Sequence, residues 1–307
     1  MNISRSLAAI AAAIILLFCT CKKDESASGG GGSTPKDTTA AVKKDTIVTV
    51  AYVEVNSNNF NNAGCYVYDT TRPFFNIACI FAANINLSST TGKPVLYYNT
   101  QVTALLNGTS YIQNLHAEGI KVLLTVLGNH QNAGWSCFTD TVTANDFAAR
   151  LSAAVAQYGF DGIDIDDEYS ACTGNDSSLV MVANAIKQKM PGKLLSKALW
   201  NDAGRFTAAW HGLSLGKLLD YGWEMSYGSD PATRLQPYLS AGVPASKLGL
   251  GAASGDADGP GVATYVKNNK LRVMMVYNVS KNSQSYLSGL SQVLFGAPAT
   301  AKAGCLQ

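Results

Sequence analysis

Residues 161–168 read DGIDIDDE and are the part of the chain best equipped for chemistry. Side chains alternate between the faces of a strand, so Asp164, Asp166 and Glu168 point to one side, about 6–7 Å apart. Three carboxylates on a buried strand cannot all ionise cheaply, so at least one should keep a proton near neutral pH. A carboxylic acid with a raised pKa is what general acid catalysis requires. We therefore expect Glu168, the last of the three, to be a general acid.

A metal site is the main alternative for this acidic segment. A calcium-binding EF-hand loop would need Gly at its sixth position, where Tyr169 stands. Ile163 and Ile165 alternate with the acids and favour a buried strand whose apolar side faces helices. The sequence has no CxxC pair or His/Cys cluster typical of zinc, although a magnesium site on another kind of barrel stays open. We expect neither a metal nor a cofactor.

From residue 47 onward the chain has eight short runs that are typical of strands, and the acidic segment overlaps the fourth of them, 160–166. Short, continuously apolar runs are typical of parallel strands buried on both faces. Helical patterns at 102–118, 144–158 and 177–190 lie between them. Eight strand–helix units over about 250 residues indicate an α/β fold, a (β/α)8 TIM barrel. An open doubly wound sheet would favour a Gly-rich fingerprint after the first strand, which is absent. The predicted strands are 47–55, 75–85, 121–127, 160–166, 194–199, 221–226, 248–252 and 272–277.

The composition excludes several other classes of protein. The 307 residues include 23 Lys+Arg and 21 Asp+Glu, a formal net charge of +2, and 47% are hydrophobic. A nucleic-acid surface would need a clustered Lys/Arg excess, so we expect no nucleic-acid partner. Intrinsic disorder of most of the chain is excluded by the same apolar content.

The amino-terminal residues look like a targeting signal. Residues 7–18 form an apolar run that suits the core of a signal peptide and is short for a membrane span of about 20 residues. A cysteine that closes such a run and opens a polar tail resembles a bacterial lipoprotein signal. We expect lipidation at Cys21, which follows the small Thr20, rather than at Cys19, which follows the bulky Phe18.

The next segment, 22–46, is rich in Gly, Ser, Thr, Lys and Asp and should behave as a flexible tether. We therefore expect three parts: a lipoprotein signal peptide over 1–21, this tether, and one catalytic domain over 47–307. The protein should be a monomer, held by its lipid at a membrane of the bacterial cell envelope. It should work in water, in the periplasm or on the outer surface.

Five cysteines follow the tether, and five is an odd number, so at least one is unpaired or forms an intermolecular bond. Cys79 lies in an apolar run and fits a small buried residue. Cys137 and Cys172 lie in polar segments after predicted strands and could form a disulfide. The sequence leaves the pairing of Cys65 and Cys305 open.

Residues 161–168 also match the DGxDxDxE signature of glycoside hydrolase family 18. More narrowly, the chain resembles the bacterial endo-β-N-acetylglucosaminidases of that family, such as endoglycosidase H. The resemblance extends over nearly all of 47–298. The segments that carry it are AYVEVN (51–56), IFAANIN (80–86), IKVLLTVLGNHQNAG (120–134), DGIDIDDEYS (161–170) and, more weakly, VYN (276–278).

The resemblance implies retaining hydrolysis in which the acetamide of the substrate replaces an enzyme nucleophile. Glu168 would protonate the leaving oxygen and later deprotonate water. Asp166 would hold the acetamide N–H and stabilise developing positive charge, and Asp164 would share a proton or hydrogen bond with Asp166. Tyr227, in an M-x-Y pattern, would donate to the acetamide oxygen. Asp161 is outside the alternating set and should support the start of the strand.

Residues at other strand ends are candidates for binding sugar. The apolar side of a pyranose packs on an aromatic ring, so Trp135 and Trp200 are candidate platforms, whereas Trp210 and Trp223 are as consistent with core positions. His130 is as consistent with a supporting role as with sugar contact. The other candidates are Asn129, Gln131, Phe81, Asn84, Tyr277, Asn278 and Glu54.

The implied activity is cleavage between the two core N-acetylglucosamines of Asn-linked glycans, of high-mannose or hybrid type. One alternative is a chitinase, which shares the acidic strand, although the segments named above and the short chain disfavour it. The other is a glycan-binding lipoprotein without catalysis. That alternative predicts loss of Glu168 or Asp166, and both are present.

Overall fold

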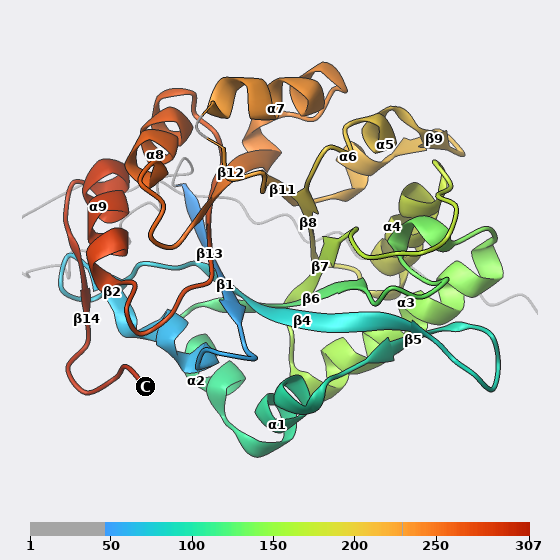
Figure 1. Cartoon of the computed structure of the whole chain (residues 1–307), viewed down its shortest axis with the longest axis horizontal. Helices are drawn as coiled ribbons and strands as arrows, with labels where there is room; N and C mark the ends of the chain where they lie inside the picture. Colours follow the sequence, from blue (N-terminus) through green and yellow to red (C-terminus); the bar gives the residue numbers. More distant parts are fainter. Residues whose placement is uncertain (1–46, 229) are drawn as a thin grey trace, which may run out of the picture. The chain divides into compact units, whose positions relative to one another are not determined.

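A computed structural model of the chain describes residues 47–228 and 230–307. Within these residues, eight parallel strands pair in the order β1-β13-β12-β11-β8-β7-β6-β4, and β1 also pairs with β4, which closes a barrel (Figure 1). The predicted TIM barrel is confirmed, and each strand begins and ends within two residues of its predicted bounds. The strands are β1 (Val48–Glu54), β4 (Ile77–Leu87), β6 (Lys121–Gly128), β7 (Gly162–Asp166), β8 (Leu194–Leu199), β11 (Tyr221–Glu224), β12 (Leu248–Ala253) and β13 (Val273–Tyr277).

Helices surround the barrel (Figure 1). The helix expected over 102–118 is wrong, because two helices, α1 (Thr100–Gly108) and α2 (Tyr111–Ala117), occupy this stretch. Thr109 between them has extended backbone, φ −134° and ψ 165°, and its hydroxyl donates to the carbonyl of Leu105 at 2.8 Å. The other helices are α3 (Thr141–Tyr158), α4 (Ser178–Lys189), α5 (Gly204–Thr207), α6 (Leu215–Leu218), α7 (Pro231–Ser240), α8 (Gly259–Asn268) and α9 (Gln284–Phe295).

The connection from β1 to β4 departs from the strand–helix repeat. It consists of a 3-10 helix, Phe60–Cys65, and the strands β2 (Tyr66–Tyr68) and β3 (Arg72–Pro73). These two strands form a small sheet with β14 (Ala299–Ala301) from the carboxy-terminal end of the chain. A disulfide joins Cys65 to Cys305 beside this sheet. The remaining short elements are β5 (Pro94–Tyr97), β9 (Ala209–Trp210), β10 (Leu213–Ser214) and the 3-10 helices Trp135–Cys137 and Ala245–Lys247.

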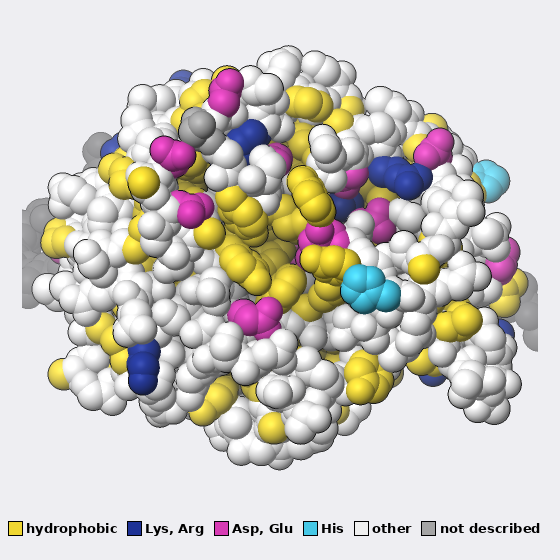
Figure 2. Space-filling model, in the orientation of Figure 1, with side chains coloured by type: hydrophobic (Ala, Val, Ile, Leu, Met, Phe, Trp, Pro, Cys, Tyr) yellow, Lys and Arg dark blue, Asp and Glu magenta, His cyan; other side chains and the backbone are white. Residues whose placement is uncertain are grey.

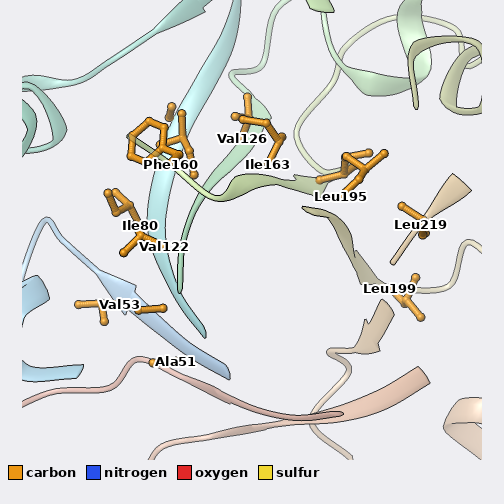
Figure 3. Packing of buried hydrophobic residues seen from close by; sticks show 14 of the residues in the cluster. Ala51, Val53, Ile80, Val122, Val126, Phe160, Ile163, Leu195, Leu199 and Leu219 are labelled. Carbon is orange, nitrogen blue, oxygen red and sulfur yellow. The ribbon is translucent and has the colours of Figure 1, made fainter. Parts of the chain in front are cut away.

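The apolar residues of each strand divide between two cores. Ile163 and Ile165 of β7 lie in the cluster between the barrel and the helices, as the alternation with acids predicted (Figure 3). The barrel interior is packed by a second cluster that includes Cys79, Leu123 and Trp223. Complete burial of one such aliphatic side chain stabilises the fold by roughly 1.5–3 kcal/mol. The outer core holds β7 through Ile163 and Ile165, and pairing with β6 and β8 fixes its register, so the acids of this strand have fixed positions.

Cys79 is buried and unpaired, and the expected Cys137–Cys172 disulfide is present. Among the residues described, no helix combines the length and apolar character needed to cross a bilayer. The expected signal peptide over 1–21 with Cys21, and the expected tether over 22–46, lie outside the described residues.

Candidate active site

A cavity of about 460 Å³ opens at the carboxyl ends of the strands. Figure 2 shows this face hollowed at its centre, with hydrophobic side chains inside the hollow and acidic side chains beside it. The site residues expected from sequence that line the cavity are Glu54, Phe81, Asp166, Glu168, Trp200, Tyr227 and Tyr277. Residues that the sequence analysis missed are Tyr52, Leu127, Tyr169, Met225 and Ser226.

Asp164 lies buried beneath the cavity and is held by three hydroxyl donors. Ser196 donates to one of its oxygens at 2.7 Å, and Thr125 donates to the other at 3.0 Å. The hydroxyl of Tyr52 donates to the same second oxygen and accepts from the indole N–H of Trp223 at 2.9 Å. Burial raises the pKa of Asp164 to about 6, against the opposing effect of these donors. The carboxyl is therefore fixed in place and titrates near neutral pH.

Asp166, two residues further along β7, is also buried but reaches the cavity. Burial raises its pKa well above the ordinary value, the charge of Glu168 raises it further, and the Lys197 ammonium opposes both. Its Oδ1 atom has no hydrogen-bond partner among the described residues. A buried carboxylate oxygen without a donor costs about 1–3 kcal/mol, so this atom is suited to accept an N–H from a ligand.

Glu168 follows the end of β7 and is half-buried on the cavity wall. Burial is the main cause that raises its pKa, while hydrogen bonding with Asp166 and the charge of Lys197 lower it. Its backbone carbonyl accepts from the N–H of Gly128 at 3.0 Å. A Cβ on Gly128 would lie 2.5 Å from this carbonyl oxygen, so only glycine permits the approach. The half-exposed position and the raised pKa suit an acid that exchanges protons with a ligand.

Contacts between the loops after β6 and β7 hold the acidic segment in place. The Cys137–Cys172 disulfide joins the two loops, and Ser136 donates from its hydroxyl to the Asp167 carboxylate. The backbone N–H of His130 donates to the carbonyl of Tyr169 at 2.7 Å. Glu168 therefore lies on a loop that is fixed by its neighbour as well as by its own strand.

Lys197 of β8 is a buried cation that the sequence analysis missed. Its side chain is 1% exposed, and its Nζ atom lies 2.6 Å from an oxygen of Asp202. Its ammonium acts on the acids of β7, because it lowers the pKa of both Asp166 and Glu168. The available signal was a lysine inside an otherwise apolar strand, where a charge is costly unless it is paired.

Aromatic rings form the opposite wall of the cavity. The rings of Tyr227 and Tyr277 have centroids 5.9 Å apart, and Tyr277 meets Phe81 edge to face at 5.6 Å. Burial raises the pKa of Tyr227, with a contribution from the acids of β7, so its hydroxyl stays protonated and can donate. Trp200 is 53% exposed, which leaves a face open to solvent.

Trp135 does not lie in the cavity, and the expectation that it is a sugar platform is wrong. Its side chain is completely buried, packs against Phe147, and donates from its indole N–H to the carbonyl of Val126 at 2.6 Å. The chain turns back beneath the loop at this point, which a sequence pattern does not indicate. Trp223 is core, and Trp210 is half-buried.

Five other candidate residues lie near the rim without lining the cavity. The ring of His130 is exposed, with its centroid 5.0 Å from that of Tyr169. The other four side chains hydrogen-bond to strand or loop residues at the strand ends: Asn84 donates to the Gly128 carbonyl, Asn129 donates to Asn86, Gln131 accepts from the Leu87 N–H, and Asn278 accepts from Asn58.

Asp161 supports the start of β7, as expected. It accepts from the Val122 N–H at 2.8 Å, and its Oδ2 atom lies 2.8 Å from the imidazole of His116. Among the described residues, no three His, Cys, Asp or Glu side chains are grouped so that they could hold a metal ion.

Closed β/α barrels with paired carboxyls at a strand end include many carbohydrate-cleaving enzymes. Residues 27–255 match the model of "Glycosyl hydrolases family 18", and the chain belongs to this family of glycoside hydrolases.

Two curated relatives are similar in sequence. The chain is 38% identical over 269 residues to an endo-beta-N-acetylglucosaminidase of Flavobacterium sp. (strain SK1022), with 82% of each chain covered. It is 31% identical over 212 residues to endo-beta-N-acetylglucosaminidase F1 of Elizabethkingia meningoseptica, with 65% of this chain and 62% of that protein covered. The resemblance to family 18 enzymes of this kind is confirmed.

Two solved structures share the fold. EndoBT-3987 of Bacteroides thetaiotaomicron, with a Man5GlcNAc product, has a TM-score of 0.72 at 23% identity; the match covers 84% of this chain and 63% of that one. A group II chitinase catalytic domain of Ostrinia furnacalis has a TM-score of 0.61 at 15% identity and is covered over its whole length, against 85% of this chain. The barrel alone therefore does not separate the two activities.

Proposed function

We propose that the chain is an endo-β-N-acetylglucosaminidase. It cuts the β1,4 bond between the two core N-acetylglucosamines of Asn-linked glycans of high-mannose or hybrid type. The observation that carries the proposal is the unpartnered Oδ1 of Asp166, buried beside the half-buried Glu168 in one cavity. An acetamide N–H is the kind of donor that this oxygen lacks. The activity named for the two curated relatives supports the same substrate.

The geometry supports a reaction in two steps. Glu168 gives its proton to the glycosidic oxygen as the substrate's acetamide oxygen attacks the anomeric carbon, and the leaving sugar departs as an alcohol. The resulting oxazolinium is stabilised by Asp166, which accepts from the acetamide nitrogen, while the Tyr227 hydroxyl donates to the acetamide oxygen during the attack. Water then adds to the anomeric carbon as Glu168 takes its proton. The bond from this carbon to the acetamide oxygen breaks, which restores the acetamide, so configuration is retained. The oxygens of Asp164 accept from Tyr52, Thr125 and Ser196 and not from Asp166. Asp164 therefore acts on Asp166 through its charge, which raises the pKa of Asp166.

Intact mass of a native glycoprotein with high-mannose chains tests the proposal. The soluble domain, 47–307, should remove each glycan except one N-acetylglucosamine. Glu168→Gln should lower the rate at least about a thousandfold, because general acid catalysis is lost with little change in shape. Glu118→Gln is the matched control, because Glu118 pairs with Lys302 at the surface.

Three outcomes would contradict this reading in different ways. Cleavage of chitin oligomers with intact glycoproteins left unchanged would make the protein a chitinase. Glycan binding without cleavage would make it a binding protein. Full activity of Glu168→Gln would show that the acid lies elsewhere.

We also propose that the protein works at the bacterial cell envelope as a monomer anchored through a lipid on Cys21. Disulfides form in exported proteins, and the two disulfides among the described residues support this location. Metabolic labelling with an alkyne fatty acid should mark the wild type and Cys19→Ser but not Cys21→Ser. Labelling of Cys21→Ser would overturn the anchor.

A further inference from the structure

Arg234 of α7 is a buried arginine outside the proposed catalytic set. It lines a second cavity, of about 580 Å³, which shares Trp200 and Ser226 with the first. Its side chain is only 6% exposed, and it forms an ion pair with Glu224. A buried cation requires partners for its donors, and these partners show what the residue does.

The guanidinium joins three segments of the chain. It donates to the carbonyl of Gly228 at 2.8 Å, to the carbonyl of Glu224 at 3.0 Å and to the carbonyl of Gly251 at 2.8 Å. Its Nε atom also donates to the Glu224 carboxylate. One planar group thereby connects α7 to β12 and to the end of β11 with the turn after it.

The acceptors in the turn flank Tyr227 on both sides. Glu224 ends β11, and Gly228 directly follows Tyr227. Tyr227 has φ +57°, a left-handed conformation that a tyrosine keeps only when its surroundings enforce it. The Glu224 carboxylate also accepts from the N–H of Ser226 at 2.9 Å, so a hydrogen bond within the turn fixes it in addition to Arg234.

Gly251 of β12 supports the same turn from beneath. A Cβ at Gly251 would lie 2.7 Å from the terminal methyl of Met275, which can move aside, 3.0 Å from the carbonyl oxygen of Glu224 and 3.2 Å from the ring of Tyr227. The turn therefore rests directly on the backbone of β12, and Arg234 clamps it there.

We propose that Arg234 is a positioning residue, which clamps residues 224–228 and so holds the Tyr227 hydroxyl against the acetamide of the substrate. The inference rests on the proposed function. Lysine keeps the charge but lacks the planar fork, so it cannot serve four acceptors in these directions. Arg234→Lys should therefore release the turn without leaving Glu224 as an unpaired buried charge.

A double-mutant cycle of Arg234→Lys and Tyr227→Phe tests the inference. Tyr227→Phe should lower kcat about a hundredfold, as loss of a preorganised donor does. Arg234→Lys should lower kcat about tenfold and leave KM nearly unchanged, and in the Tyr227→Phe background it should change kcat less than about twofold. Arg205→Lys is the matched control, because Arg205 pairs with Asp176 at 2.7 Å on another loop. This control should keep wild-type kcat.

Gly251→Ala is the second variant, and it decides the matter if Arg234→Lys does not fold. It keeps Arg234 but presses on Tyr227, so it should lower kcat and lose this effect when Tyr227 is Phe. Independent, multiplicative losses in both cycles would overturn the inference and assign Arg234 to stability alone. Wild-type kcat in Arg234→Lys would overturn it as well. A wild type that cleaves no Asn-linked glycan would instead overturn the proposed function and, with it, the inference.

Discussion

Asp164 and Asp166 lie on the same face of one strand, yet their surroundings give them different tasks. Asp164 has hydroxyl donors on both oxygens, so it is fully satisfied without a ligand. Asp166 keeps one oxygen without a donor in the described part of the chain, and it faces the cavity. The residue that pays a solvation cost in the free protein is thus the one that gains a partner from substrate. Spacing alone predicted that the three acids share a face, but not this division between them.

The titration of Asp164 should be visible in the stability of the protein. Its pKa is about 6 in the folded state against 3.8 in a model peptide, so the folded state binds the proton more tightly. This contribution is complete below about pH 4 and is lost as the pH rises through about 6, a change of about 3 kcal/mol. Unfolding of wild type and Asp164→Asn between pH 4 and 7 checks it, with wild type losing stability relative to the variant. Parallel curves for the two proteins would show that Asp164 does not titrate in this range.

Lys197 should set the pH range of activity. The Lys197→Met variant keeps the length of the side chain and removes the charge that lowers the pKa of Glu168 and Asp166. Both limbs of the profile of kcat/KM against pH should therefore move upward. The groups that face the ammonium are Asp202 after β8, Asp166 at the end of β7 and Asp167 directly after it. The same charge acts on Asp164 and Glu168. Lys197→Met leaves the Asp202 carboxylate without its partner, so adding Asp202→Asn should restore stability. If the pH profile does not move in either variant, Lys197 contributes only to packing.

At the scale of elements, the strands followed from the sequence more closely than the helices and loops. A strand buried on both faces is a continuous apolar run, and this pattern changes only where the strand ends. The helix expected over 102–118 was wrong because a threonine hydroxyl ends α1 by a local hydrogen bond that the apolar period does not register. Trp135 was misplaced for a related reason, since its burial depends on the path of a loop. Tyr52 was missed because it lies in the middle of β1, whereas the candidates were sought at strand ends.

The disulfide between the loops after β6 and β7 should matter for activity more than for the barrel. Cys137 and Cys172 are separated by 35 residues, so replacing both with serine should cost up to about 4 kcal/mol through loop entropy. The same change loosens the loop that carries Glu168, so kcat should fall even at temperatures where the variant is fully folded. Near-ultraviolet circular dichroism and kcat at 20 °C separate the two effects. A folded variant with wild-type kcat would show that β7 alone positions the acid.

At the scale of the molecule, the cavity and the start of the first barrel strand lie at opposite ends of the barrel. The cavity lies at the carboxyl ends of the strands, whereas Ile47, the first described residue, precedes the amino end of β1. Ile47 lines a pocket together with Lys121, Leu194 and Tyr221, which are the first residues of β6, β8 and β11. Ile47 therefore lies at the end of the barrel opposite to the cavity.

The Cys65–Cys305 disulfide spans 240 residues and closes almost the whole barrel into a covalent ring. A protease that cuts one loop anywhere within this ring produces a nicked molecule, and the two pieces stay joined. Such a cut should give a single band on a gel without reductant and two bands with it. One cleavage within this ring therefore leaves both fragments joined in a single molecule.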